Sequence, residues 1–223
     1  MLNLNQVDAI IFDLDDTLYL EQDYVLSGFY AIAKELASYG VSTDESYQHL
    51  CNYFHTKGRV GCLDSLLDTL KHIEAMPNIE ELVLLYRSHK PTIQLSEMVK
   101  ATLTKIQEQG IKTAIVTDGL GQMQKNKIAA LGLKRYINHF IYCWDLDAPK
   151  PSTKGFELAL SKLKCPAENC ILVGDNPEHD IKPANKLGIY SIRLLQGRFK
   201  NIPDSQNYPA NQHCQSMHTF FET

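Results

Sequence analysis

Short apolar segments recur along the chain and predict strands that are buried in a sheet. They occupy residues 7–12, 113–117, 139–144, 170–174 and 190–195. None of them alternates strictly between apolar and polar positions, which is typical of strands covered on both faces. We therefore expect a sheet in the interior of the fold, with other elements packed on either side.

Helical patterns separate these segments beyond residue 95. Val99, Leu103 and Ile106 recur at helical spacing after Ser96, a residue type that caps helix N-termini. Further helical patterns cover residues 123–132 and 156–163. Strands that alternate with helices predict an α/β fold with a parallel sheet and right-handed connections.

Residues 20–90 interrupt this alternation, because they show helical periodicity only. Ile32 and Leu36 lie on one apolar stripe, and Asn78 with Glu81 carries the signal of a helix start. Four such amphipathic segments can bury one another as a small bundle. We expect residues 20–90 to form a helical domain, inserted into an α/β domain made of residues 1–19 and 91–223.

Composition excludes several classes of protein. The 223 residues are 44% hydrophobic and 22% charged, with a formal net charge of -4, so the positive excess of a nucleic-acid binder is missing. No apolar run approaches the ~18–20 residues of a membrane span, and the first ten residues lack the pattern of a signal peptide. We expect a cytoplasmic protein without a nucleic-acid or membrane partner.

Polar side chains follow four of the predicted strands. In chain order they are Asp13 and Asp15, Thr117 and Asp118, Lys150, and Asp175 with Asp180. In open parallel sheets, ligands bind beyond the carboxyl ends of the strands, so we expect these residues to converge. Carboxylate and carbonyl oxygens suit Mg²⁺, which commonly shares its coordination with substrate phosphate and water. A bound cation would also offset the repulsion among the acids of FDLDDTLYL, residues 12–20.

Four motifs carry a resemblance to a known family. FDLDDT, VTDG, KP and GDNPEHD occur in this order, with a helical insert after the first, and together resemble the haloacid dehalogenase-like (HAD) superfamily. The resemblance covers nearly the whole chain up to about residue 197. It implies a doubly wound parallel sheet as the core and a type-one helical cap as the insert.

The resemblance implies a covalent mechanism of phosphoryl transfer. Asp13 would be the nucleophile that forms an aspartyl-phosphate, a recognised role of carboxylates. Asp15 would protonate the leaving alcohol and later deprotonate the hydrolytic water, which requires a carboxyl that holds a proton near neutral pH. Crowding of the two acids raises one of their pKa values. Mg²⁺ would be bound by the carboxylates of Asp13 and Asp175 and by the main-chain carbonyl of Asp15.

The remaining motif residues would hold the phosphoryl group. By the resemblance, Thr117 and the backbone N–H of Asp118 bind phosphate oxygens, and Lys150 neutralises charge on the phosphoryl group and on Asp13. Asp180 would orient Lys150 or a metal-bound water. Asp118 departs from the asparagine that the family often has at this place, and a second anion near the phosphate site could alter substrate choice.

These residues favour a Mg²⁺-dependent phosphatase that acts on a small soluble phosphomonoester, with the insert closing over the core. Dehalogenases of the family need no acid to protonate halide and typically lack the second aspartate, whereas this chain keeps Asp15. A phosphomutase with the same phosphoenzyme, or a non-catalytic protein that binds phosphate and metal, stays open. The sequence identifies neither the substrate nor the oligomeric state.

Simpler interpretations of individual residues also stay open. Asp favours turns, so Asp16 is expected to be a local turn or cap residue, and Asp180 could cap the helix that follows it. His179 is expected in an exposed loop. His89 of the insert is expected to be a solvated surface group.

Overall fold

The computed structural model describes residues 7–217, which form two compact units. Residues 7–21 and 94–217 make up the first unit, and Gln22–Ile93 make up the second. Among the residues that the structure describes, no helix combines the length and the apolar character needed to cross a bilayer.

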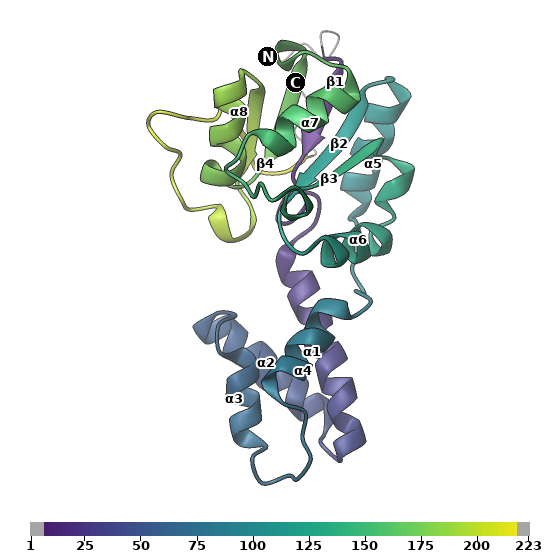
Figure 1. Ribbon diagram of the computed structural model, residues 1–223, viewed down its shortest axis with the longest axis vertical. Coiled ribbons are helices and arrows are strands. Elements are labelled where there is room, and N and C mark those ends of the chain that lie inside the picture. The colour runs from purple at the N-terminus through teal and green to yellow at the C-terminus, as the bar shows by residue number, and fades with distance from the viewer. Residues whose placement is uncertain (1–6, 218–223) are drawn as a thin grey trace. The chain divides into compact units, whose positions relative to one another are not determined.

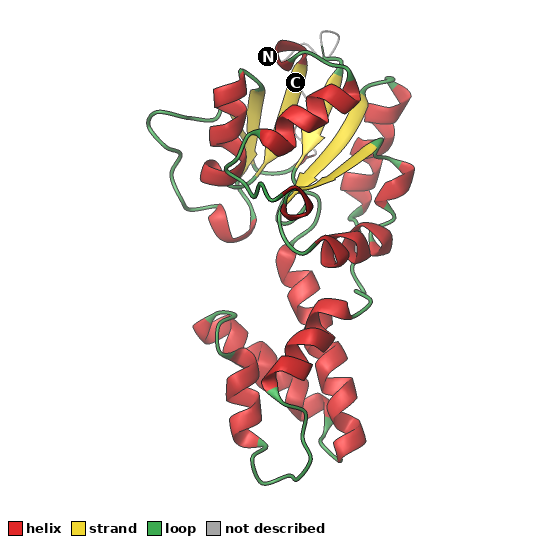
Figure 2. Ribbon diagram, viewed as in Figure 1, coloured by secondary structure: helices red, strands yellow, loops and turns green. Residues whose placement is uncertain are grey.

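The first unit is built on a parallel sheet of six strands (Figures 1 and 2). The strands are β1 (Ala9–Phe12), β2 (Lys112–Thr117), β3 (His139–Tyr142), β4 (Cys170–Gly174), β5 (Tyr190–Leu194) and β6 (Gln212–Cys214). Their order is β3-β2-β1-β4-β5-β6, and every neighbouring pair is parallel. Ile11 of the central strand β1 pairs with Ala114 on one side and Leu172 on the other. The predicted α/β class is confirmed, with its helical insertion between β1 and β2.

Helices cover both faces of this sheet. They are α5 (Glu97–Glu108), α6 (Gly121–Ala130), α7 (Lys154–Leu163) and α8 (Lys182–Leu187). Phe156 of α7 and Ala184 of α8 pack into one apolar cluster with Ile11. Ile10 and Phe12 point to the opposite face, because side chains alternate along a strand, and they too are fully buried. The central strand β1 is therefore apolar on both faces, as the sequence pattern indicates.

Shorter turns of helix complete both units. The 3₁₀ turns are Ala37–Tyr39, Leu133–Arg135, Trp144–Leu146, Ala167–Asn169 and Gly197–Phe199, and the one π-helical turn described is Pro177–Ile181.

The second unit is a bundle of the helices α1 (Glu21–Leu36), α2 (Thr43–Lys57), α3 (Cys62–Thr69) and α4 (Ile79–Ser88). Its core gathers apolar side chains from all four helices, among them Phe29, Leu50, Leu66 and Leu82. The unit extends to Ile93, whereas the sequence analysis placed its end at residue 90. Thr92, which lies beyond the expected end, is held to the unit by a buried hydroxyl that the hydrophobic pattern does not reveal.

That hydroxyl belongs to Ser27 of α1. It accepts a hydrogen bond from the backbone N–H of Thr92 at 2.8 Å and lies 3.2 Å from Nε2 of His89. The segment after α4 is thereby held against α1. His89 is buried, so the expectation of a solvated surface histidine is wrong.

Arg193 of β5 ties the loops beyond the sheet together. Its side chain is 1% exposed, and its guanidinium donates to the main-chain oxygens of Asp175, Phe199 and Ile202 at 3.0, 2.7 and 2.7 Å. It also pairs with Asp204. The chain then returns to form β6 at the edge of the sheet, a strand that the sequence pattern did not predict.

We expect Arg193→Met to lower the free energy of unfolding by about 3–5 kcal/mol, because the substitution removes the buried arginine that pairs with Asp204 and donates to three main-chain oxygens. Chemical denaturation of both proteins measures this difference. Arg198→Met is the matched control, since Arg198 is 62% exposed and lies 3.8 Å from Glu21. A surface pair of this kind contributes less than about 1 kcal/mol. Equal losses for the two variants would refute the assigned importance of Arg193.

Candidate active site

Asp13 and Lys150 meet at the carboxyl end of the sheet. Asp13 directly follows β1, and its backbone N–H continues the strand pairing by donating to the oxygen of Val173 at 2.9 Å. Nζ of Lys150 lies 2.6 Å from Oδ1 of Asp13 and 2.7 Å from Oδ1 of Asp180. The hydroxyl of Thr17 donates to Oδ2 of Asp13 at 3.3 Å. All four polar side chains are buried, so these contacts hold the Asp13 carboxylate in one orientation.

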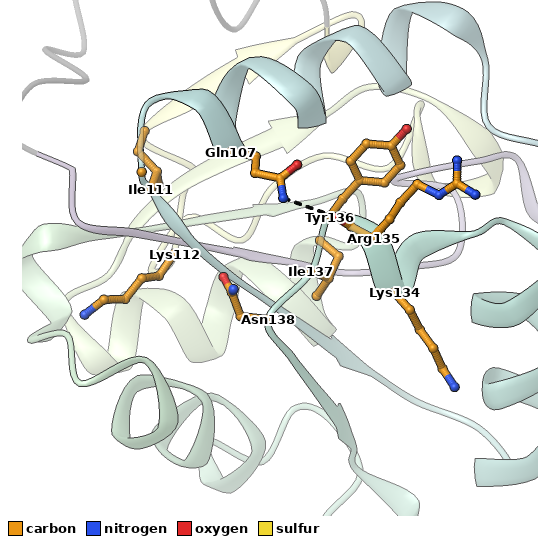
Figure 3. Close-up of a pocket in the computed structure, with 9 residues that line it drawn as sticks. Gln107, Ile111, Lys112, Lys134, Arg135, Tyr136, Ile137 and Asn138 are labelled. Atoms are coloured by element: carbon orange, nitrogen blue, oxygen red, sulfur yellow. Dashed lines mark hydrogen bonds between the residues drawn. The ribbon is translucent and has the colours of Figure 1, made fainter.

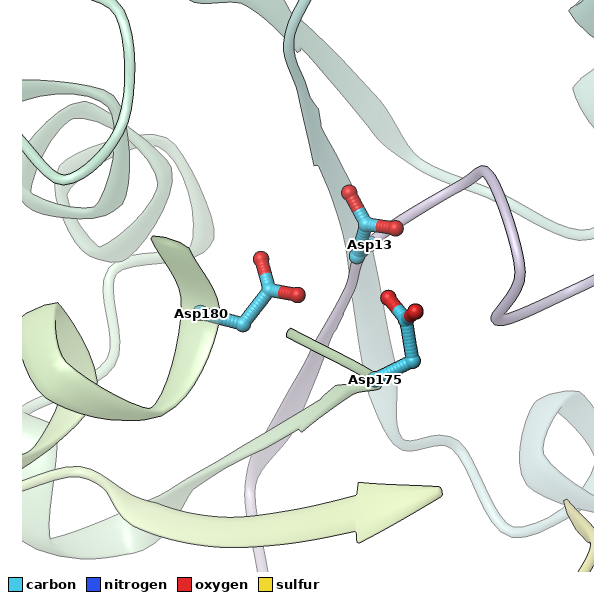
Figure 4. Close-up of side chains that lie close together, drawn as sticks. All are labelled: Asp13, Asp175 and Asp180. Carbon is cyan, nitrogen blue, oxygen red and sulfur yellow. The ribbon is translucent and has the colours of Figure 1, made fainter. Parts of the chain in front are cut away.

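Asp175, after β4, completes a group of three converging carboxylates (Figure 4). Asp13, Asp175 and Asp180 each offer an oxygen within 4.8 Å of the others. Within residues 7–217, Oδ2 of Asp175 is buried and has no hydrogen-bond partner. Three carboxylates beside the single ammonium of Lys150 leave two negative charges in excess, which a divalent cation would neutralise. The donor set and the unsatisfied oxygen therefore fit a hard cation such as Mg²⁺.

Burial dominates the electrostatics of this cluster. Burial raises the pKa of Asp13 to about 7, although Lys150 opposes the shift. Burial and the charges of Asp13 and Asp180 raise the pKa of Asp175 to about 10. For Lys150, burial works to lower the pKa, but Asp13 and Asp180 raise it well above its usual range. Without a cation, protons partly replace the missing positive charge on the carboxylates.

Asp180 approaches the end of β4 closely. Besides Lys150, it accepts a hydrogen bond from the backbone N–H of Asn176 at 3.1 Å. A Cβ on Gly174 would lie 2.7 Å from the side chain of Asp180, so a larger residue would displace the carboxylate. The side chain of Asn176, not that of Asp180, caps the following turn by accepting from the N–H groups of Glu178 and His179.

Asp15 faces helix α6. Nζ of Lys127 lies 2.7 and 2.9 Å from its two carboxylate oxygens, and the side-chain amide of Gln124 donates to Oδ2 at 2.9 Å. The hydroxyl of Tyr19 donates to Oδ1. Burial alone would raise the pKa of Asp15, but the charge of Lys127 and these hydrogen bonds lower it overall. Of the two crowded acids, Asp13 is the one whose pKa is raised.

Thr117 is linked to the same helix. Thr117 is 1% exposed at the end of β2, and its hydroxyl accepts a hydrogen bond from the side-chain amide of Gln124 at 2.5 Å. One amide thus contacts both Thr117 and Asp15, two residues that the sequence analysis singled out. Gln124 and Lys127 themselves were missed by that analysis, although polar residues three positions apart on the predicted helix were a signal of one shared face.

The side chain of Asp118 is directed at the loop after β3. Both carboxylate oxygens lie 3.1 Å from the backbone nitrogen of Lys150, which donates to them. Lys150 is joined to Pro151 by a cis peptide bond. Asp118 therefore connects the loops that follow two strands, and an asparagine could accept the same hydrogen bond through its carbonyl oxygen.

We expect Asp118→Asn to keep kcat/KM within about threefold, because one acceptor oxygen is retained, whereas Asp118→Ala should cost about 1 kcal/mol of stability. Steady-state kinetics and thermal denaturation of the two variants measure the difference. A loss of activity as large in the asparagine variant as in the alanine variant would show that the negative charge itself matters.

Asp16 has a structural place in the turn after Asp15. Its backbone adopts a φ of +54°, and its two carboxylate oxygens accept from the N–H groups of Glu21 and Arg198 at 2.8 and 3.2 Å. A Cβ on Gly197 would lie 2.1 Å from the carboxyl carbon of Asp16, so only glycine fits there. The loop after β5 thus fixes the turn that presents Asp15.

A pocket of about 340 Å³ opens at the other end of the sheet (Figure 3). Its walls are residues 107, 110–112 and 134–138, which precede β2 and β3 or begin β2. The candidate site lies beyond the carboxyl ends of the same strands, so this pocket is separate from it.

Named phosphatases resemble the chain over most of its length. A glyceraldehyde 3-phosphate phosphatase of Methanocaldococcus jannaschii is 28% identical over an alignment of 215 positions, which covers 90% of each chain. A pyrophosphatase PpaX of Halalkalibacterium halodurans is 27% identical over 84% of this chain and 86% of its own.

Solved structures share the fold. The putative HAD-hydrolase YfnB of Bacillus subtilis, bound to magnesium, has a TM-score of 0.70 at 17% identity, and a HAD phosphatase of Thermococcus onnurineus has a TM-score of 0.61 at 22% identity. Both likenesses cover 97% of each chain. The family model of haloacid dehalogenase-like hydrolases matches residues 10–194. The chain therefore belongs to the haloacid dehalogenase-like hydrolase family.

Proposed function

We propose that this protein is a Mg²⁺-dependent phosphatase that hydrolyses small phosphomonoesters with Asp13 as its nucleophile. One observation supports this above all: Lys150 bridges Asp13 and Asp180, while Asp175 offers an oxygen within 4.8 Å of both acids and its buried Oδ2 has no hydrogen-bond partner among the described residues. A buried carboxylate that lies beside a fixed ammonium and a second carboxylate able to bind a cation suits attack on an anionic phosphoryl group, because the like charges must be neutralised first.

In the first step, a carboxylate oxygen of Asp13 forms a bond to phosphorus as the bond from phosphorus to the leaving oxygen breaks. Asp15 gives its proton to that leaving oxygen, and an alcohol departs. In the second step, water attacks phosphorus and its proton passes to Asp15, while the bond between phosphorus and Asp13 breaks and phosphate is released. The lowered pKa of Asp15 suits the ionised form that the second step uses, but it opposes the protonated form that the first step needs.

The other residues hold the phosphoryl group and the cation. The ammonium of Lys150 would neutralise phosphoryl charge next to Asp13, and Thr117 with the backbone N–H of Asp118 would bind phosphoryl oxygens. The carboxylates of Asp13 and Asp175 and the carbonyl of Asp15 would hold Mg²⁺. When bound, the ion would supply the positive charge that lets an anionic nucleophile approach an anionic substrate.

The names of the relatives support a small phosphorylated substrate without identifying it. They include a glyceraldehyde 3-phosphate phosphatase, a pyrophosphatase and a ribulose-1,5-bisphosphate 5-phosphatase of Halopiger xanaduensis. A phosphate-release screen should therefore span phosphorylated aldehydes, sugars, acids and nucleotides, with pyrophosphate as a further member.

The screen tests the proposal when it is run with Mg²⁺, with a chelator, and in ¹⁸O-labelled water. We expect phosphate release that depends on Mg²⁺ and one labelled oxygen in the released phosphate. Transfer of the phosphoryl group to a second sugar hydroxyl, without label, would identify a phosphomutase instead. Binding of Mg²⁺ and beryllofluoride without turnover of any substrate would support a non-catalytic protein.

A further inference from the structure

Helix α6 carries two polar side chains on its buried face. Gln124 is 1% exposed and Lys127 is 3% exposed, and the two lie three positions apart, so they share one side of the helix. Lysine is almost never fully buried unless it is paired, because removing an ammonium from water is costly. A buried lysine next to a buried amide therefore calls for partners of matching chemistry.

Those partners are Asp15 and Thr117, and the proposed function assigns a role to each of them. Lys127 contacts both oxygens of Asp15, at 2.7 and 2.9 Å, and Gln124 donates to one of the same oxygens at 2.9 Å. Gln124 also donates to the hydroxyl of Thr117 at 2.5 Å. All four residues belong to the same compact unit. The side-chain amide of Gln124 thus links Asp15, which would protonate the leaving oxygen, to Thr117, which would bind a phosphoryl oxygen.

We propose that Gln124 and Lys127 are positioning residues that fix the Asp15 carboxylate relative to Thr117, an inference that rests on the proposed phosphatase function. The ammonium of Lys127 fixes the direction of the carboxylate by contacting both of its oxygens. Gln124 fixes the distance between the Asp15 carboxylate and the Thr117 hydroxyl. Alignment of the acid with the leaving oxygen matters because small misplacements of a reacting group cost large factors in rate.

The dependence of the rate on the leaving group tests this role. Removing Lys127 should let the Asp15 carboxyl turn away from the leaving oxygen, and correct placement of its proton matters most when that oxygen is strongly basic. We expect Lys127→Met to lower kcat/KM by about 10²-fold with glycerol phosphate, an alkyl ester, but by less than about tenfold with 2,4-dinitrophenyl phosphate. Lys127→Arg should restore most of the activity toward the alkyl ester.

Lys125 offers a matched control on the same helix. It is half exposed, lies 3.4 Å from Asp145 and stands over the ring of Tyr142, away from Asp15. Lys125→Met removes the same charge from α6, and we expect it to leave kcat/KM unchanged for both esters. Gln124→Leu is a second variant that changes no charge, and it should show the same selective loss with the alkyl ester.

An Asp15→Asn background separates positioning from general damage. If Lys127 acts through Asp15, Lys127→Met should add no further loss once the carboxylate is gone, so the two effects should not add. A loss that is equal for both esters, or that adds fully to the Asp15→Asn loss, would overturn the inference. Circular dichroism and Mg²⁺ binding are recorded for each variant, and Gln124→Leu decides the question if Lys127→Met is unfolded.

Failure of the inference and failure of the proposed function give different results. If the wild-type protein hydrolyses neither ester in the presence of Mg²⁺, the proposed function fails and this inference fails with it. If the wild-type protein hydrolyses both esters but Lys127→Met and Gln124→Leu behave like Lys125→Met, only the inference is wrong.

Discussion

Asp13→Asn is expected to lower kcat/KM for phosphate release by about 10⁴-fold or more, because the amide cannot supply the nucleophilic oxygen anion. The substitution keeps the shape of the side chain and an oxygen that can accept from Lys150. Burial raises the pKa of Asp13 to about 7, so the charged form is already disfavoured without a cation. A neutral amide should therefore leave the folded state intact, and thermal denaturation checks this.

Asp147→Asn is the control for this change. Asp147 is exposed and adopts a φ of +49°, a conformation that asparagine tolerates. We expect its activity to equal that of the wild-type protein. Phosphate release by a folded Asp13→Asn protein at more than about a hundredth of the wild-type rate would exclude Asp13 as the nucleophile.

Asp175→Asn is expected to abolish both the activity and the thermal stabilisation by Mg²⁺. Asp175 contributes the unsatisfied oxygen of the cluster, and a neutral amide is a far poorer ligand for a hard cation than a carboxylate. A cation that binds only the folded protein raises its melting temperature, and each kcal/mol corresponds to ~2–4 °C for a chain of this size. Thermal denaturation with and without Mg²⁺ measures the difference, with Asp147→Asn as the control.

The pH dependence of the metal-free protein follows from the same cluster. Asp175 titrates at 3.8 in the unfolded chain and at about 10 in the folded one, and Asp13 titrates at 3.8 and about 7. Between these values the folded protein holds more protons than the unfolded chain, so its stability falls as the pH rises. This stabilisation is complete below pH 3.8, and it is lost as the pH rises through about 7 and then about 10.

The stabilisation by Mg²⁺ should therefore grow between about pH 6 and about pH 9, because the cation takes the place of bound protons. In Asp175→Asn, the metal-free protein should lose less stability over the same range, since one of the two shifted carboxyls is gone. An unchanged gain from Mg²⁺ in this variant would show that the ion binds elsewhere.

Much of the fold could be predicted because burial leaves a direct trace in the sequence. The five short apolar segments became β1 to β5, and Ser96 caps α5 by accepting from the N–H of Val99. Asn78 and Glu81 form the complete capping box that their spacing indicates. β6 could not be predicted, because its three residues include Gln212 and His213 and depend on pairing with β5.

The positions of Asp13, Lys150, Asp175 and Asp180 could be predicted because parallel strands bring their carboxyl ends to one edge. The contacts of Asp15 could not. They depend on which face of α6 turns inward, and a lysine in a helix usually lies in solvent. The role of Asp16 in holding the loop at Gly197 depends on residues about 180 positions apart, beyond the reach of any local pattern.

The covalent step can be observed directly. The protein would be mixed with a phosphomonoester that it hydrolyses, quenched in acid within the first turnover, digested and analysed by mass spectrometry. We predict one phosphoryl group on the peptide that contains Asp13, dependent on Mg²⁺ and absent from the Asp13→Asn protein. Rapid turnover with no phosphorylated peptide, or with the phosphoryl group on another residue, would contradict the account.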